Sequence, residues 1–182
     1  MICSQVIAGL CKDCESSKGG IIEVYAANYG DIKPTVSAGT ITSFTLADTG
    51  VSVYKYEFRK GTGSMTSTLN VDAANGVNYV STELVLQFSR METRKRIEMA
   101  ALAVGELVFI VKDANGKFWY LGFDEPVTAS AGNGQTGQAI GDGNFYSITL
   151  LDNADSWPYE VLASAVESLN ATCPEERTQN NG

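Results

Sequence analysis

Histidine is absent from this chain of 182 residues. Its absence excludes Ser-His-Asp and Cys-His nucleophilic catalysis, zinc sites of the His-Glu-x-x-His type and any histidine general base. Much of hydrolase chemistry depends on one of these arrangements. We therefore expect a protein that is not an enzyme and that carries no cofactor.

Basic residues are also scarce. Lys and Arg number 13 against 21 Asp and Glu, which leaves a net charge of -8. A protein that binds nucleic acid neutralises its phosphates with clustered Lys and Arg. We expect DNA to be repelled by this chain and not specifically bound.

Long apolar runs are missing as well. The longest candidate, Ala100 to Val111, is interrupted by Gly105 and Glu106, and a membrane span needs about 20 apolar residues. The N-terminal stretch MICSQVIAGLCKDCES has no basic start, no continuous apolar stretch and no small-residue cleavage site of a secretory signal. The sequence predicts no membrane association and folding in a cytoplasm.

The sequence has the alternation typical of a β-rich globular domain, with 44% hydrophobic residues and 18 glycines. Strands are predicted at 21–27, 40–46, 51–59, 82–88, 127–129, 145–151 and 156–161, with a hairpin over 107–123 around Asn115-Gly116. We expect the strands at 51–59 and 82–88 to pair, and the segment from Gly30 to Gly39, which contains Pro34, to form a loop. These patterns predict a β-sandwich or barrel in one domain over 1–161. The extension over 162–182 is predicted to hold a short helix at 162–169 and then a frayed polar tail.

One flanking helix is predicted at about 90–105, within the stretch from Ser89 to Glu106. Ser89 is a candidate N-cap with Glu92 three residues later, and Gly105 is a candidate stop. The apolar residues Ile97, Ala100, Ala101 and Val104 stand at the three- and four-residue spacing of a helix. The basic run Arg94, Lys95 and Arg96 is expected on the solvated side.

The segment from Lys60 to Val80 is predicted to be a long arm, partly a β-hairpin, that leaves the body of the domain. It is rich in Ser, Thr and Asn, and Asn75-Gly76 is a strong two-residue turn signal. A segment of this length without its own core is uncommon unless it is functional or disordered. We expect it to be mobile in a lone subunit and ordered by strand pairing with a neighbour. The residues assigned to this assembly arm are Gly61, Met65, Leu69, Val71, Asn75, Gly76 and Tyr79.

Several patterns allow a chemical interpretation and a simpler one. Cys11 and Cys14 form a CxxC pair that, with Cys3 and Cys173, allows a zinc site; zinc sites usually present two close pairs, so reduced thiols are favoured. Gly132 to Gly137 matches GxGxxG, but a strand and not a helix follows, which favours a mobile loop over a phosphate site.

Acidic and aromatic residues offer further candidates. The pairs Asp124 with Glu125 and Asp152 with Asp155 match no calcium loop and stay unassigned. Trp119, Tyr120 and Trp157 suit a sugar site in principle, but a hairpin must place alternate residues in a core, and core is the favoured role of Trp119.

The order of these segments resembles tail-tube and tail-hub virion proteins of phages of Bacteroidetes, including crAss-like phages. The resemblance rests on overall layout and covers most of the chain up to about Val161. It runs through GLCKDC, KGGIIEVYAA, VYKYEFRKGTGSMTSTL, NYVSTELVLQFSRMETRKRIEMAAL, LVFIVKDANGKFWYLGF and TGQAIGDGNFYSITL.

This resemblance implies a structural virion protein whose subunits form a cyclic homo-oligomer in the tail. Further partners would be other tail or neck proteins, with DNA only in transit, and assembly would take place in the cytoplasm of the host bacterium. A lumen lined by an acidic protein would repel DNA and so not trap it. Two alternatives stay open: another virion role, such as capsid decoration or a head-tail connector, and a β-sandwich module that binds carbohydrate or a receptor through Trp157, Tyr159 and the glycine-rich loop.

Overall fold

The computed structural model describes residues 10–12 and 14–173. Its strands are β1 (Ile21–Asn28), β2 (Ile32–Ser37), β3 (Thr40–Leu46), β4 (Tyr54–Glu57), β5 (Gly63–Asp72), β6 (Val77–Ser89), β7 (Leu107–Asp113), β8 (Phe118–Leu121), β9 (Thr128–Gln135), β10 (Phe145–Ala154) and β11 (Tyr159–Val161). The helices are α1 (Thr93–Val104) and α2 (Ala163–Glu167).

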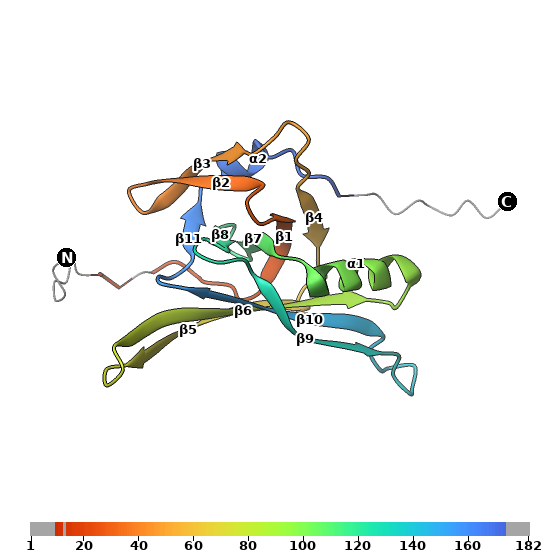
Figure 1. The fold of residues 1–182 in the computed structure, drawn as a ribbon. Coiled ribbons are helices and arrows are strands. Elements are labelled where there is room, and N and C mark those ends of the chain that lie inside the picture. The colour runs from red at the N-terminus through yellow and green to blue at the C-terminus, as the bar shows by residue number, and fades with distance from the viewer. Residues whose placement is uncertain (1–9, 13, 174–182) are drawn as a thin grey trace.

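The strands form two sheets that pack together without closing into a barrel (Figure 1). One sheet has seven strands in the order β2-β3-β11-β8-β7-β1-β4, and the other has four in the order β5-β6-β10-β9. Neighbouring strands are antiparallel except β11 and β3, which are parallel. The mainly β prediction is confirmed in its sandwich form.

The first hydrophobic core lies between the two sheets. Alternate residues of each central strand point into it, as strand geometry requires. The four-stranded sheet contributes Leu84, Leu86, Ile148 and Leu150, and the seven-stranded sheet contributes Val24, Phe109, Val111 and Leu121.

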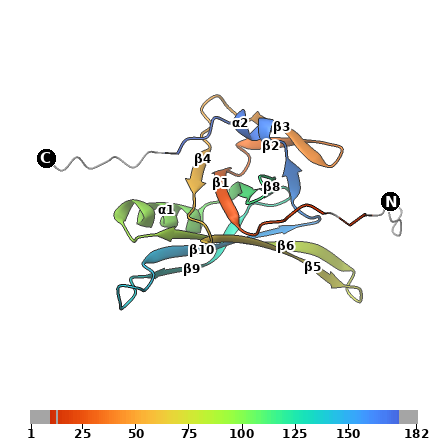
Figure 2. The ribbon, with the colours of Figure 1, turned by 180° about the vertical axis from the view of Figure 1, so that it is seen from behind.

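A second core covers the opposite face of the seven-stranded sheet. Val108 and Ile110 of β7 point into it, so β7 is buried on both faces, which explains its continuous apolar run. The β2–β3 hairpin and α2 lie over this face (Figure 2). The short helix predicted at 162–169 is found as α2, and its segment contributes Ala165, Val166 and Leu169 to the second core. The polar tail from residue 174 lies outside the described residues.

Helix α1 is present where predicted, but its orientation and its start are not as predicted. Its N-cap position is Glu92 and not Ser89, while Gly105 ends it as expected. Leu102 and Met99 face the core. The stripe of Ile97, Ala100, Ala101 and Val104, expected at the core, is exposed. The basic run is split, because Arg94 and Arg96 are exposed while Lys95 is half-buried and donates to the backbone oxygen of Ser89.

Two strand predictions are wrong. The expected loop from Gly30 to Gly39 contains β2, in which Pro34 is tolerated because β2 is an edge strand. The segments 51–59 and 82–88 do not pair: β4 pairs with β1, and β6 pairs with β5 and β10. Amphipathic alternation identifies which face of a strand is buried, but not which strand lies beside it.

Candidate assembly surface

The four-stranded sheet ends in two edge strands, β5 and β9. In the part of the chain that the structure describes, β5 pairs only with β6, and β9 pairs only with β10. Each edge strand therefore presents a row of backbone N–H and C=O groups without a strand partner, which is a template for pairing with another chain.

The residues that carry these outward groups follow from the ladder alternation of antiparallel strands. The N–H of Gln87 donates to the carbonyl oxygen of Thr62 at 3.1 Å, so the even-numbered residues of β5 bond to β6. Met65, Ser67 and Leu69 then face outward. The N–H of Arg90 donates to the oxygen of Asn144 at 2.7 Å, and the same alternation leaves Gly132 and Gly134 facing outward on β9.

The composition of these edges does nothing to prevent pairing. Neither β5 nor β9 contains proline, lysine or arginine, and Asp72 at the end of β5 is their one charged residue. Proline and lysine are the usual guards of an exposed edge. A bulge at Ser130 interrupts β9 near its start, whereas β5 pairs without interruption over its full length.

The outer face of this sheet is polar and almost uncharged. By register it carries Ser64, Thr66, Thr68, Asn70, Asp72, Val77, Tyr79, Ser81, Glu83, Val85, Gln87, Ser89, Thr128, Ala131, Asn133, Gln135, Phe145, Ser147, Thr149, Leu151 and Asn153. No Lys or Arg is among them, and the two charged residues, Asp72 and Glu83, are acidic. This face therefore offers no cationic anchor to a phosphate backbone.

The residues assigned to the assembly arm fall into two groups. Met65 packs on the first core, and Gly61 precedes β5 at a positive φ of 80°. Leu69, Val71 and Tyr79 are exposed toward the tip, where Asn75 and Gly76 form the turn. Figure 1 shows this hairpin extending beyond the body of the domain. The predicted protruding hairpin is thus confirmed, and its base packs on the body of the domain.

The arm also has a strand partner within its own chain. β5 pairs with β6 along its whole length, from Gly63 opposite Leu86 to Asp72 opposite Val77. The hairpin is therefore paired within its own chain, and pairing with a neighbour stays a prediction. A neighbouring chain would add to the opposite edge of β5.

The cysteine and glycine motifs form no site in the described residues. Cys11, Cys14 and Cys173 are exposed free thiols, and Cys3 lies outside the described residues. Within residues 10–12 and 14–173, no three Cys, Asp or Glu side chains gather to hold a metal ion. Gly132 and Gly134 lie in strand β9 and not in a loop. At Gly134 a Cβ would meet the ring of Tyr146 at 3.0 Å, so glycine leaves room for that ring.

The residues suggested for carbohydrate binding do not converge. Trp157 follows β10, whereas the glycine-rich loop precedes it, so the length of a ten-residue strand separates them. Tyr159 packs against Phe123, with ring centroids 4.6 Å apart. Trp119 is half-buried and donates its ring N–H to Asp113 at 3.0 Å, while Tyr120 is buried in the second core.

Asp152 is a buried carboxylate on the inner face of β10, opposite Thr82. Its Oδ1 atom has no hydrogen-bond partner among the described residues. Burial raises the pKa of Asp152 to about 6, and the negative charges of Asp124 and Glu125 contribute to this rise. A hydrogen bond from the backbone of Gly122 acts in the opposite direction and lowers the pKa. Extending the inward alternation of Ile148 and Leu150 by two residues would have identified this position from the sequence.

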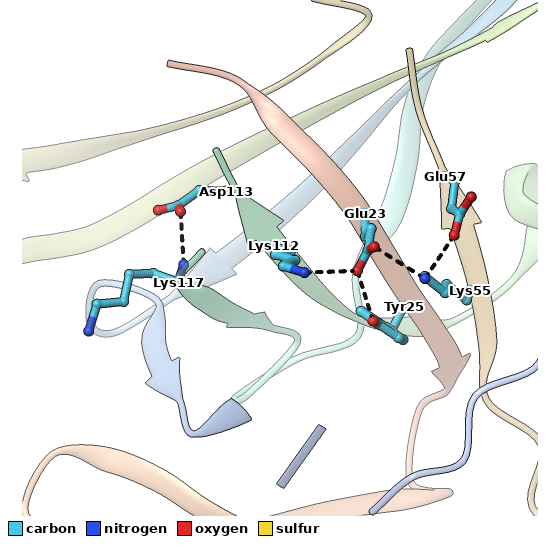
Figure 3. A network of polar contacts seen from close by, with 7 residues as sticks. All are labelled: Glu23, Tyr25, Lys55, Glu57, Lys112, Asp113 and Lys117. Carbon is cyan, nitrogen blue, oxygen red and sulfur yellow. Dashed lines mark hydrogen bonds and ion pairs between the residues drawn. The ribbon is translucent and has the colours of Figure 1, made fainter. Parts of the chain in front are cut away.

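Glu23 is the opposite case, a half-buried carboxylate with several partners (Figure 3). Lys55 lies 3.2 Å and Lys112 3.4 Å from its carboxylate, and the Tyr25 hydroxyl donates to it at 3.0 Å. Burial by itself would raise the pKa of Glu23, but the hydrogen bonds from Lys55 and Tyr25 and the two lysine charges lower it. Burial and the bond to Glu23 in turn raise the pKa of Tyr25 to about 12. Balanced pairing of this kind stabilises the sheet and leaves no activated group.

A hollow of about 630 Å³ lies between β4 and α1. Its charged residues include pairs that satisfy one another: Lys95 with Glu92 at 3.1 Å and Lys55 with Glu57 at 2.8 Å. The Tyr56 hydroxyl donates to Glu98 at 3.1 Å across the hollow, and burial followed by the Glu98 charge raises the pKa of Tyr56. The Tyr56–Glu98 hydrogen bond ties β4 to α1.

No family model, curated protein or solved structure matches the chain. Among the described residues, neither helix has the length and apolar character required to span a membrane. The fold defines the class as a two-sheet, mainly β sandwich, and its four-stranded sheet has two open edges and a polar outer face.

Proposed function

We propose that this protein is a structural subunit of a bacteriophage tail, of the tail-tube or tail-hub kind, that assembles into rings. In each ring the β5 edge of one copy pairs with the β9 edge of the next, and the four-stranded sheets together form the wall of a conduit for DNA. The observation that carries the proposal is the pair of unguarded edges at opposite sides of one sheet.

Strand directions support a cyclic arrangement. Because all pairs in the four-stranded sheet are antiparallel and the number of strands is even, β5 and β9 run in opposite directions. A copy related by rotation alone therefore brings its β5 antiparallel to β9, and the alternation of the sheet continues. Such a head-to-tail contact closes into a ring when the rotation divides a full turn.

The outer face of the sheet supports the role of conduit wall. DNA in transit must not be held, and a face whose charged residues are Asp72 and Glu83 supplies no cation to bind phosphates. The ring joins other tail or neck proteins at its ends.

The test removes one outward backbone donor. Gly132→Pro deletes the outward N–H of β9, and Gly132→Ala is the matched control because a Cβ there meets only the Ser147 oxygen, at 3.6 Å. Light scattering and negative-stain images should show rings for the natural chain and for Gly132→Ala, and a folded monomer for Gly132→Pro.

Two results would contradict the proposal: a persistent monomer of the natural chain under all assembly conditions, or unchanged rings of Gly132→Pro. Rings located in the capsid or neck of a virion would replace the tail assignment with capsid decoration or a connector. Saturable glycan binding that depends on Trp157, without rings, would favour the binding module.

A further inference from the structure

We infer that the apolar tip of the β5–β6 hairpin of one copy docks on the outward stripe of helix α1 of a second copy in the next ring of a stack. The inference rests on the proposed function, because it supplies the axial contact between rings. It concerns side chains at the two ends of the sheet, whereas ring closure concerns the backbone of its edges.

The hairpin tip exposes apolar side chains on both faces. Leu69 and Val71 are 47% and 63% exposed, and the register with Val80 and Asn78 places them on the inner face of the sheet. Val77 and Tyr79 are exposed on the outer face. Exposed apolar side chains gathered at one place indicate an interaction site.

Helix α1 carries the second half of the contact. Ile97, Ala101 and Val104 stand at spacings of four and three residues and form one exposed stripe, with Ile97 56% and Val104 86% exposed. The same helix already buries Leu102 on its other side. A helix with a second apolar stripe needs a second element to cover it.

These two surfaces cannot meet within one chain. β6 runs from the tip toward α1 over 13 residues, about 40 Å at the rise of an extended strand. Figures 1 and 2 show the tip at one end of the four-stranded sheet and α1 over the other end. Copies repeated along the strand direction bring the tip of one onto the helix of the next.

Charge favours this pairing over contact between like surfaces. Asp72 adjoins Val71 at the tip, while the first turn of α1 contains the exposed Arg96 and no acidic residue. Tip against tip would oppose two aspartates, and helix against helix would oppose the arginines. Tip against helix joins opposite charges and covers both apolar surfaces.

The experiment uses cross-linking between two preparations of the full chain in which Cys3, Cys11, Cys14 and Cys173 are Ser. One preparation carries Val71→Cys, and the other carries Ala101→Cys and an affinity tag. They are mixed under a mild oxidant and analysed by non-reducing electrophoresis, with rings scored in parallel by negative stain. The control replaces Ala101→Cys by Val36→Cys, an exposed position on β2.

Docking holds the two thiols at a high effective concentration, so heterodimer should exceed the control by about tenfold. Heterodimer at the control level overturns the inference whether or not rings form. Heterodimer above the control without rings supports the tip contact and contradicts the proposed function, so the two failures are distinguishable.

A second pair of variants keeps the four natural cysteines, so that it does not depend on folding of the cysteine-free chain. Val71→Asp and Val104→Asp each place a charge in one half of the contact, at positions that are exposed in the single chain. Each should leave rings intact and abolish their stacking into tubes. Tubes formed by either variant as readily as by the natural chain would overturn the inference.

Discussion

The edge strands of one sheet are protected from pairing with another chain, and those of the other sheet are not. The seven-stranded sheet ends at β2, which contains Pro34, and at β4. The N–H of Lys55 in β4 donates to the Thr172 oxygen, and the N–H of Thr172 donates to the oxygen of Val53, just before β4, each at 2.9 Å. The four-stranded sheet ends at β5 and β9, which have neither proline nor a basic residue. Because one chain contains both kinds of edge, the open edges mark a particular surface and are not a general property of the composition.

The carboxylates of Glu23, which is half-buried, and Asp152, which is buried, differ between the sheets in a similar way. Glu23 on the seven-stranded sheet has Lys55, Lys112 and Tyr25 as partners. Asp152 on the four-stranded sheet has an oxygen without a hydrogen-bond partner in the part of the chain that the structure describes. The carboxylate of Glu23 is therefore paired, whereas the burial of Asp152 carries a desolvation cost that an uncharged side chain of the same shape would reduce.

The largest effect is expected from removing the protection of β4. Thr172→Pro deletes the N–H that donates to Val53 and should lower the free energy of unfolding by about 3 kcal/mol, as well as expose the strand edge. Urea unfolding measures the loss, and light scattering detects aggregation through β4. Thr172→Val keeps the N–H and serves as control; equal stability of the two variants would mean that Thr172 does not protect this edge.

Asp152→Asn should stabilise the protein by about 2 kcal/mol at pH 8. The pKa of Asp152 is about 6 in the folded protein and 3.8 ordinarily. The protonated side chain does not destabilise the fold below pH 3.8. The free energy of unfolding falls as the pH rises from 3.8 through 6, because the side chain then ionises while buried. The variant lacks this titration, so its advantage should vanish at pH 4. Thermal unfolding across this range is the measurement, and a gain that is independent of pH would exclude titration of Asp152 as the cause.

Glu23→Gln should destabilise the protein by about 1 kcal/mol at pH 7, because Lys55 and Lys112 lose a charged partner that is only partly screened by solvent. The folded pKa of Glu23 lies below its ordinary 4.5. Its contribution is therefore present above pH 4.5 and is lost as the pH falls through the folded pKa. Denaturant titrations at pH 7 and pH 3 should show the gap narrowing; a constant gap would assign the loss to packing.

The smallest effect on stability, below about 0.5 kcal/mol, is expected from Thr149→Lys on the outer face of the four-stranded sheet. The proposed rings would repeat this charge around their conduit, so rings of the variant should bind DNA at low salt, whereas rings of the natural chain should not. Ser43→Lys places the same charge on the exposed surface of β3 as a control. Equal DNA binding by both variants would show that the outer face of the four-stranded sheet does not line the conduit.

Local patterns predicted most strands, because alternation and turn residues act within a few positions. The β7–β8 hairpin around Asn115 and the turn at Gly76 are of this kind. β2 was missed because Pro34 excludes a central strand but not an edge, and edge status depends on the whole sheet. The inward face of α1 was misassigned because its most apolar stripe, which includes Ile97 and Val104, is not the stripe that the fold buries.

The assembly surface was predicted only in part. The tip residues Leu69, Val71 and Tyr79 lie on a protruding hairpin, as the sequence indicated. The β9 edge was not found, since TASAGNGQ has too few large side chains to show alternation. Its pairing is determined by β10 and not by its own composition.

The position of Thr172 in the chain has a consequence for synthesis on the ribosome. All strands of the four-stranded sheet precede residue 155, whereas the contact that covers β4 requires residue 172. A nascent chain therefore completes its open edges before its last protective contact leaves the ribosome. Neighbouring ribosomes on one messenger RNA hold such chains close together, so the proposed pairing between β5 and β9 would compete during translation with unwanted pairing at β4.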